Sequence, residues 1–148
     1  GPYTTPLYGL VPTPFAFLKY QDGAVGNSKP SGDFINPNLL SDLNTAAKLS
    51  GVTPTITTAK TGHSPAGRHV NGTGIDIAIV NGLGSGGATN STNGNAKFRE
   101  DGLKLVKELQ KLGYKWNVGE SGNPRVVLFQ IGGAFGNHYN HLHVSNTI

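Results

Sequence analysis

Apolar side chains recur with helical spacing in two segments of the chain. Across residues 38–50 leucines and alanines share one face, with Pro37 suited to a first turn and Gly51 to a stop. Across residues 96–112 an apolar stripe runs between charged positions, formed by Phe98, Leu103, Val106, Leu109 and Leu112. We therefore predict two amphipathic helices, each of which buries one face.

Shorter segments with β-branched or alternating residues predict strands. They are residues 52–58, 74–80, 114–116, 125–131 and 141–145. In the second of these, strand alternation places Asp76 with Ala78 and Val80 on one face, and the isoleucines at 75, 77 and 79 on the other. This strand therefore presents one carboxylate on the face opposite its isoleucines.

Two further segments lack any periodicity. Residues 1–36 combine prolines with aromatic side chains, which predicts an irregular N-terminal arm packed on the domain. Residues 81–95 are mostly Gly, Asn, Ser and Thr, so we expect a long exposed loop that can move over a site. Together these elements predict an α+β fold. A small antiparallel sheet, flanked by two or more helices, forms a single domain over residues 37–148.

The composition limits which kinds of functional site the chain can form. The 148 residues suit one domain, and the absence of cysteine excludes disulfides, cysteine-ligated metals and thiol catalysis. The formal charge of +4 comes from basic residues that alternate with acidic ones, so we expect no nucleic-acid partner. No apolar run is long enough for a membrane span, and no signal peptide is predicted. Any metal must be held by histidines and carboxylates.

The five histidines fall in two short windows. His63 and His69 lie in the first, and His138, His141 and His143 in the second. A strand directs positions i and i+2 to the same side, so two imidazoles on one strand and Asp76 on another can assemble a three-ligand site. Zinc accepts such nitrogen and oxygen ligands and keeps a position for water, which favours a hydrolytic site. Alternatively, these histidines are ordinary hydrogen-bonded or surface groups.

Two motifs resemble those of a known family. Residues 69–76, His-Val-Asn-Gly-Thr-Gly-Ile-Asp, resemble the His-x-x-Gly-x-Ala-x-Asp signature of the zinc peptidases that include lysostaphin-type enzymes and D-Ala-D-Ala carboxypeptidases. Residues 141–143 resemble their closing His-x-His. The resemblance implies that His69, Asp76 and His143 bind one Zn²⁺ per chain and that His141 assists the reaction. His138 extends the likeness, since its spacing to His141 is similar to that in murein endopeptidases of the same superfamily.

This resemblance also implies a function. We expect hydrolysis of an amide bond in bacterial peptidoglycan stem peptide, by a carboxypeptidase or an endopeptidase, with the bond itself left open. Arg68 and Lys60 are candidates for binding a substrate carboxylate, with plain surface charge as the alternative. The expected location is extracellular, periplasmic or virion-associated, either as a free-standing protein or as part of a larger phage or secreted protein.

The chain departs from the family pattern at two positions. Gly74 replaces the alanine of the signature, a small-for-small change that we expect to be tolerated. Asn140 stands where the carboxypeptidase branch commonly has a general-base Asp or Glu, and an amide cannot accept the proton of water. Asn140 is therefore a candidate substrate-binding residue instead.

The missing carboxylate leaves the general base and the activity open. The base is His141, His138 or a remote carboxylate such as Glu120. Otherwise the chain is a catalytically weak or inactive zinc-binding module that recognises the cell wall or a protein partner. A metal-free structural domain of a larger assembly is the third alternative.

Overall fold

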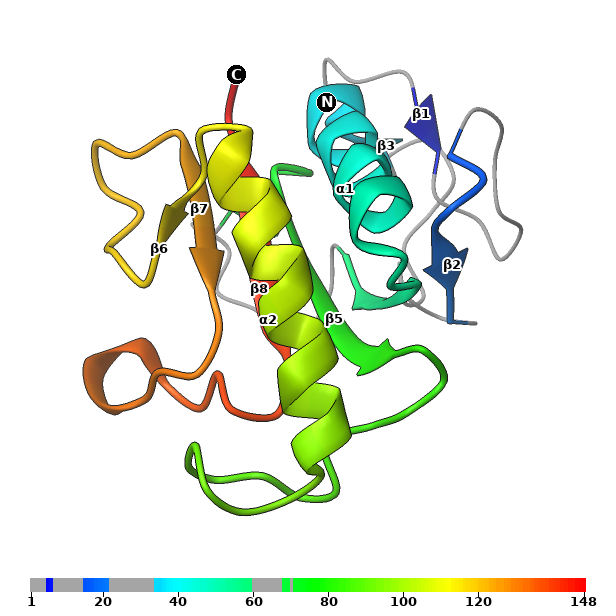
Figure 1. The fold of residues 1–148 in the computed structure, drawn as a ribbon. Coiled ribbons are helices and arrows are strands. Elements are labelled where there is room, and N and C mark those ends of the chain that lie inside the picture. Colours follow the sequence, from blue (N-terminus) through cyan, green and yellow to red (C-terminus); the bar gives the residue numbers. More distant parts are fainter. Residues whose placement is uncertain (1–4, 7–14, 22–33, 60–67, 70) are drawn as a thin grey trace.

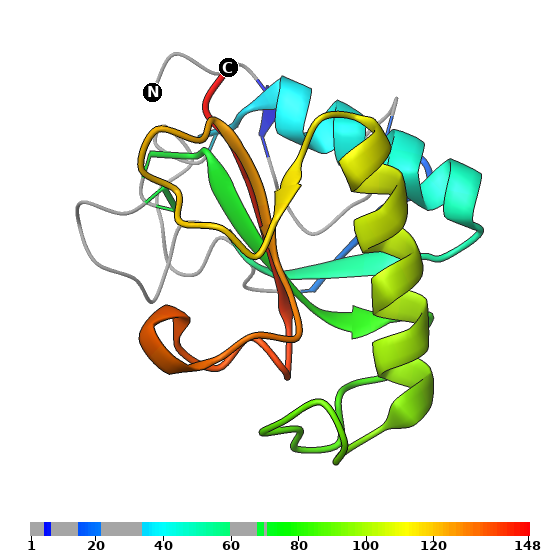
Figure 2. The same ribbon diagram turned by 60° about the vertical axis from the view of Figure 1, so that its left-hand side comes forward.

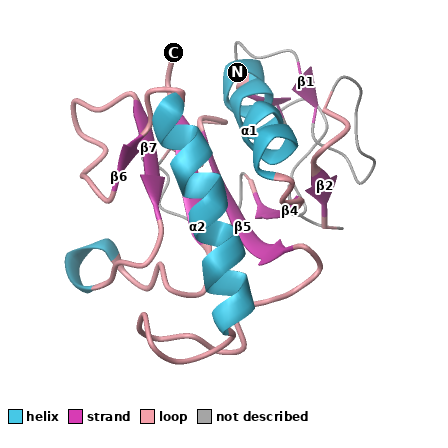
Figure 3. Cartoon of the chain, in the orientation of Figure 1, coloured by secondary structure: helices cyan, strands magenta, loops and turns pink. Residues whose placement is uncertain are grey.

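The fold is α+β, as predicted. The computed structural model describes residues 5–6, 15–21, 34–59, 68–69 and 71–148. Within these residues, one mixed sheet carries two helices that lie side by side on the same side of it (Figures 1 and 2). Figure 3 shows how much of the chain between these elements is loop. None of the described helices is long and apolar enough to cross a membrane.

Both predicted helices form, close to their predicted limits. Helix α1 spans Pro37–Ser50, and the Asn36 side chain caps it by accepting the N–H of Asn38; helix α2 spans Ala96–Lys111 and is capped in the same way by Asn95. The predicted stripe of α2 is partly wrong, because Leu105 is fully buried whereas Leu103 and Leu112 are only partly buried.

The main sheet has the strand order β2-β4-β5-β8-β7-β6 within the described residues. Its strands are β2 (Lys19–Tyr20), β4 (Pro54–Thr58), β5 (Gly74–Val80), β6 (Lys115–Trp116), β7 (Arg125–Leu128) and β8 (Leu142–Asn146). The four inner strands pair antiparallel, as predicted, whereas β2 and β6 add to the two edges in parallel and make the sheet mixed. Strands β1 (Thr5–Pro6) and β3 (Phe34–Ile35) form a separate pair.

Part of the N-terminal segment belongs to the main domain. Strand β2 extends the sheet, and Phe15, Leu18 and Ile35 are buried in the same hydrophobic cluster as the two helices. Within the predicted 1–36 arm, residues 1–4, 7–14 and 22–33 lie outside the described residues.

Strand β5 separates the core from the opposite face of the sheet. Ile75 and Ile77 are fully buried in the core, as alternation predicts, but further along Val80 is buried and Ile79 is only partly buried. The register against β4 shifts between these positions, with Ala78 as the extra residue. A bulge reverses the alternation beyond it, which is why the prediction for Ile79 and Val80 is wrong.

The loop at residues 81–95 is mostly exposed, as predicted, and is held by its own side chains. The Asn93 amide oxygen accepts the backbone N–H groups of Thr89 and Asn90, and that of Asn90 accepts those of Thr92 and Asn93. Its Ser85 side chain lies close to β4 and β5. Movement of this loop over a site stays a prediction.

Helix α2 meets the sheet through a glycine, which yields a test of the packing. A Cβ added at Gly102 would lie 2.5 Å from Cε2 of Phe129, a ring that is itself fully buried. Alanine normally stabilises a helix relative to glycine by about 0.5–1 kcal/mol. We expect Gly102→Ala to destabilise the fold by about 1–3 kcal/mol in urea unfolding, because the core is overpacked. Gly119→Ala, where a Cβ has open space, is the matched control. Equal unfolding midpoints for the two variants would contradict the packing.

Candidate metal centre

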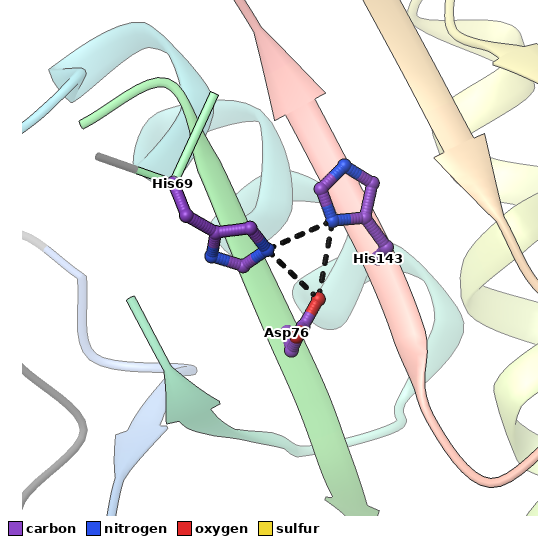
Figure 4. Close-up of side chains that lie close together, drawn as sticks. All are labelled: His69, Asp76 and His143. Atoms are coloured by element: carbon purple, nitrogen blue, oxygen red, sulfur yellow. Dashed lines mark hydrogen bonds and ion pairs between the residues drawn. The ribbon is translucent and has the colours of Figure 1, made fainter. Parts of the chain in front are cut away.

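Two adjacent strands and one turn bring together residues from the two motifs, 69–76 and 141–143. Asp76 on β5 lies directly opposite His143 on β8, and both side chains leave the sheet on the face away from the helices (Figure 4). His69 reaches them from the turn before β5. That turn is closed by the N–H of Thr73, which donates to the Arg68 carbonyl at 2.9 Å.

The three side chains form a nearly equilateral triangle of ligand atoms. Asp76 Oδ1 lies 3.1 Å from His143 Nδ1 and 3.2 Å from His69 Nε2, and the two nitrogens are 3.1 Å apart. Tetrahedral zinc with metal–nitrogen bonds near 2.0 Å has ligand–ligand distances of about 3.3 Å. All three residues are buried. This group can therefore hold a metal ion.

The outer contacts of the two imidazoles indicate what occupies the centre of the triangle. His69 Nδ1 donates to the Ala59 carbonyl at 2.6 Å, and His143 Nε2 donates to Glu120 Oε2 at 2.9 Å. Because a carbonyl and a carboxylate only accept, the neutral rings carry their protons there. Their other nitrogens then turn lone pairs toward Asp76 Oδ1. Three such acceptors in contact require either protons or a cation between them.

Two carboxylates of the site carry negative charges that a proton on His143 or a metal cation can compensate. Burial alone would raise the pKa of Asp76, but hydrogen bonds from His143 and His69 and their charges hold it well below its usual range. Burial lowers the pKa of His143, yet Asp76 and Glu120 outweigh it and raise that pKa to about 9. Glu120 is also partly desolvated, but its bond to His143 brings its pKa down to about 2. Both carboxylates are therefore anionic at neutral pH.

A cavity opens above the three ligands. Its volume is about 520 Å³, and its walls come mainly from the segments at 119–120 and 135–138, with one residue each from β7 and β8. A second hollow of about 310 Å³ lies over β4 and β5, lined by the neutral side chains of Thr57, Thr58, Ser85 and Asn140. Asp76 and His141 line both spaces. The metal-binding group therefore lies where the two hollows meet.

The remaining two histidines of the second window line the larger cavity. His141 precedes β8 rather than belonging to it, so the predicted strand starts one residue too early. Its Nδ1 donates to Asn140 Oδ1 at 2.6 Å, and its Nε2 lies 3.8 Å from Asp76 Oδ1. The His138 ring is 4.7 Å from that of His141. Burial, followed by the charges of His141 and His143, lowers the pKa of His138 to about 4.

The candidate substrate-binding residues differ in their placement. Arg68 borders the larger cavity, but its guanidinium donates to the backbone carbonyls of Glu120, Asn123 and Pro124 and to the Ser145 hydroxyl. Binding of a substrate carboxylate by Arg68 therefore stays a prediction, with these contacts competing for its N–H groups. Lys60 and His63 lie outside the described residues.

Tight packing surrounds Gly74, the position of the alanine in the signature. A Cβ there would lie 3.2 Å from His143 Cε1 and 3.2 Å from Arg68 Cβ. An alanine side chain would require the ligand ring or the neighbouring arginine to move by a few tenths of an ångström. Glycine thus lets β5 pass close beneath the site.

From the sequence, Glu120 was predicted only as a remote candidate for the general base. Its contact with His143 spans 23 positions and depends on how the 119–124 segment folds against β8. The Ala59 carbonyl was not predicted at all, since a backbone acceptor has no signature in the sequence. Both groups act on the ligand rings from outside the triangle.

The pKa of His143 predicts how metal binding depends on pH. A metal ion bound at Nδ1 must replace the proton that this ring holds below about pH 9. With Zn²⁺ as the probe, we expect release of about one proton from His143 near pH 7.5, and apparent affinity that rises about tenfold per pH unit between about pH 7 and pH 8.5. Calorimetry in buffers of different ionisation enthalpy measures both. Affinity independent of pH over this range would contradict it.

No family model matches the chain, and neither a curated protein nor a solved structure matches it. The likeness to the zinc peptidases therefore consists of the two motifs described above. The interpretation of the site therefore rests on its chemistry, a buried group of two imidazoles and one carboxylate that could hold a metal ion.

Proposed function

We propose that this chain is a zinc-dependent hydrolase that cleaves an amide bond in bacterial peptidoglycan stem peptide. One observation carries the proposal: the buried triangle of His69, Asp76 and His143 lies at the floor of a cavity whose wall holds two further histidines. The resemblance of the two motifs to zinc peptidases supports the substrate class. Such a substrate places the protein outside the cytoplasm or on a virion.

Zinc is the metal that suits this group best. Two neutral nitrogens and one carboxylate oxygen, spaced near a tetrahedral edge, match its ligand preference, whereas calcium and magnesium take more oxygen ligands. When bound with three protein ligands, zinc lowers the pKa of a coordinated water to about 7 and polarises a carbonyl.

The second-window histidines supply the proton transfers. Since His141 Nδ1 donates to Asn140, Nε2 of the neutral ring keeps its lone pair and faces the Asp76 side of the site. That nitrogen accepts a proton from the attacking water and returns it to the leaving amine when the C–N bond breaks. Asn140 thus orients the base without itself taking a proton.

His138 extends this proton-transfer group. Its Nδ1 donates to the Gly136 carbonyl at 3.3 Å, which leaves Nε2 as an acceptor in the neutral ring. A pKa near 4 keeps it neutral at physiological pH, so it does not add a positive charge beside His141. His138 is therefore the second candidate base.

The two hollows support a peptide substrate. They meet at Asp76 and His141, so a chain that lies across the strands has room on both sides of the bond to be cut. The smaller hollow offers hydroxyl and amide groups, which suit the backbone of a peptide.

Asn140 favours a second candidate function, a zinc-binding module that recognises wall peptide without cutting it. In that case the histidines bind substrate and do not exchange protons with it. The two functions share the metal and the cavity but differ in whether product is released.

Digestion of purified peptidoglycan tests the proposed activity. We expect zinc-loaded protein to release new amino groups, a metal chelator to abolish this, and Asp76→Asn to lose it together with bound zinc, because the anionic ligand is gone. Glu100→Gln, a surface carboxylate on α2, is the matched control and keeps full activity. Zinc-loaded protein that binds the wall polymer and releases nothing would favour the binding module.

Two further variants assign the base. His141→Ala is expected to lower kcat by about 10²–10⁴ while the zinc content stays unchanged, because proton transfer contributes about that much. His138→Ala is expected to lower it less, since its ring contacts His141 rather than Asp76. The reverse order of the two effects would make His138 the base.

A further inference from the structure

A carboxylate outside the ligand triangle contacts one of its rings. Glu120 Oε2 accepts the Nε2 proton of His143 at 2.9 Å, on the edge of the imidazole opposite the metal-facing Nδ1. The ring lies between Glu120 and the ligand triangle, so this carboxylate is badly placed to take a proton from a water there. Its geometry instead fits a group that orients a ligand.

The effect on His143 follows from the chemistry of imidazole. A neutral ring has one proton, and an acceptor at Nε2 keeps the proton on that atom. Nδ1 then retains its lone pair toward Asp76 and His69. A carboxylate in this position also makes the ring a better donor of electron density to a metal.

Glu120 is held in place by a side chain next to another ligand. Arg68 precedes His69 and donates to the backbone carbonyls of Glu120 and Asn123, while its Nε lies 3.6 Å from Glu120 Oε2. It also donates to the Ser145 hydroxyl on β8 at 2.9 Å, two residues from His143. One guanidinium therefore joins the turn that carries His69, the 119–124 segment and the strand that carries His143.

We propose that Glu120 is a positioning residue of the metal centre, which fixes His143 with Nδ1 toward the metal, and that Arg68 sets the position of Glu120. This proposal rests on the metal-binding part of the proposed function and not on hydrolysis. It gives the Arg68 guanidinium a role in assembling the site, in place of binding a substrate.

The test measures Zn²⁺ affinity by competition with a chromogenic chelator over a range of pH, and compares the pH-independent affinities because Glu120 also raises the pKa of His143. We expect Glu120→Ala to weaken binding by about 10–100-fold, and Glu120→Gln to recover most of that loss because its amide oxygen still accepts the Nε2 proton. Glu108→Ala, which removes a partly buried carboxylate on α2 paired with Lys111, is the matched control and leaves affinity unchanged. A loss below about tenfold in Glu120→Ala, or equal losses in the alanine and glutamine variants, would overturn the proposal.

A second readout separates positioning from a general loss of structure. Long-range ¹H–¹⁵N spectra of the zinc-loaded protein are expected to show His143 protonated at Nε2, with this proton exchanging faster in Glu120→Ala. Arg68→Lys is expected to weaken Zn²⁺ binding in the wild-type background and to have little further effect in Glu120→Ala, as for two residues that act through one contact. Additive effects would remove Arg68 from the proposal.

The Asp76→Asn variant separates the two levels of the proposal. If it binds Zn²⁺ as tightly as the wild type, the metal centre itself is wrong and the role of Glu120 falls with it. If it loses Zn²⁺ while Glu120→Ala does not, the metal centre stands and only the role of Glu120 is refuted.

Discussion

The antiparallel pairing of β5 with β8 is the interaction on which the site depends. It sets Asp76 directly opposite His143, so the two ligand atoms come within 3.1 Å without any adjustment of the loops. The same pairing directs Ile77 and Leu142 to the other face, where both are fully buried beneath the helices. Burial of that apolar face fixes the register, because a slip by one residue would turn the ligands into the core.

Placing the site on the face of the sheet opposite α1 and α2 has an electrostatic consequence. A buried carboxylate and two buried imidazoles are costly to desolvate unless their charges are compensated. Here each ring has an outer acceptor, the Ala59 carbonyl for His69 and the Glu120 carboxylate for His143. The inward nitrogens and Asp76 are left to compensate one another or a cation. Because the outer nitrogens already have acceptors, the buried inner atoms are arranged for a metal ion rather than for a solvated polar patch.

The fold was predictable where local rules decide it. Helical spacing predicted α1 and α2, helped at α1 by Pro37 and Gly51, since an apolar stripe, a first-turn proline and a stop glycine act within one or two turns. Predictions failed where pairing with a neighbouring strand or a turn of the backbone set the local structure. The bulge at Ala78 moved Val80 into the core. The strand predicted over residues 125–131 ends at Leu128, and Gln130 just beyond it has a φ of 61°.

The sequence by itself supplied the candidate ligands through the resemblance of its two motifs to those of zinc peptidases, because a motif is a local property of the chain. His69, Asp76 and His143 could be named before any fold was known, and the structure brings them together. Only the tertiary structure decided what surrounds them. Glu120 contacts His143 across 23 positions, and Arg68 donates to a backbone carbonyl of the same 119–124 segment. Such meetings depend on how β7, β8 and their connecting loops pack, which no local pattern encodes.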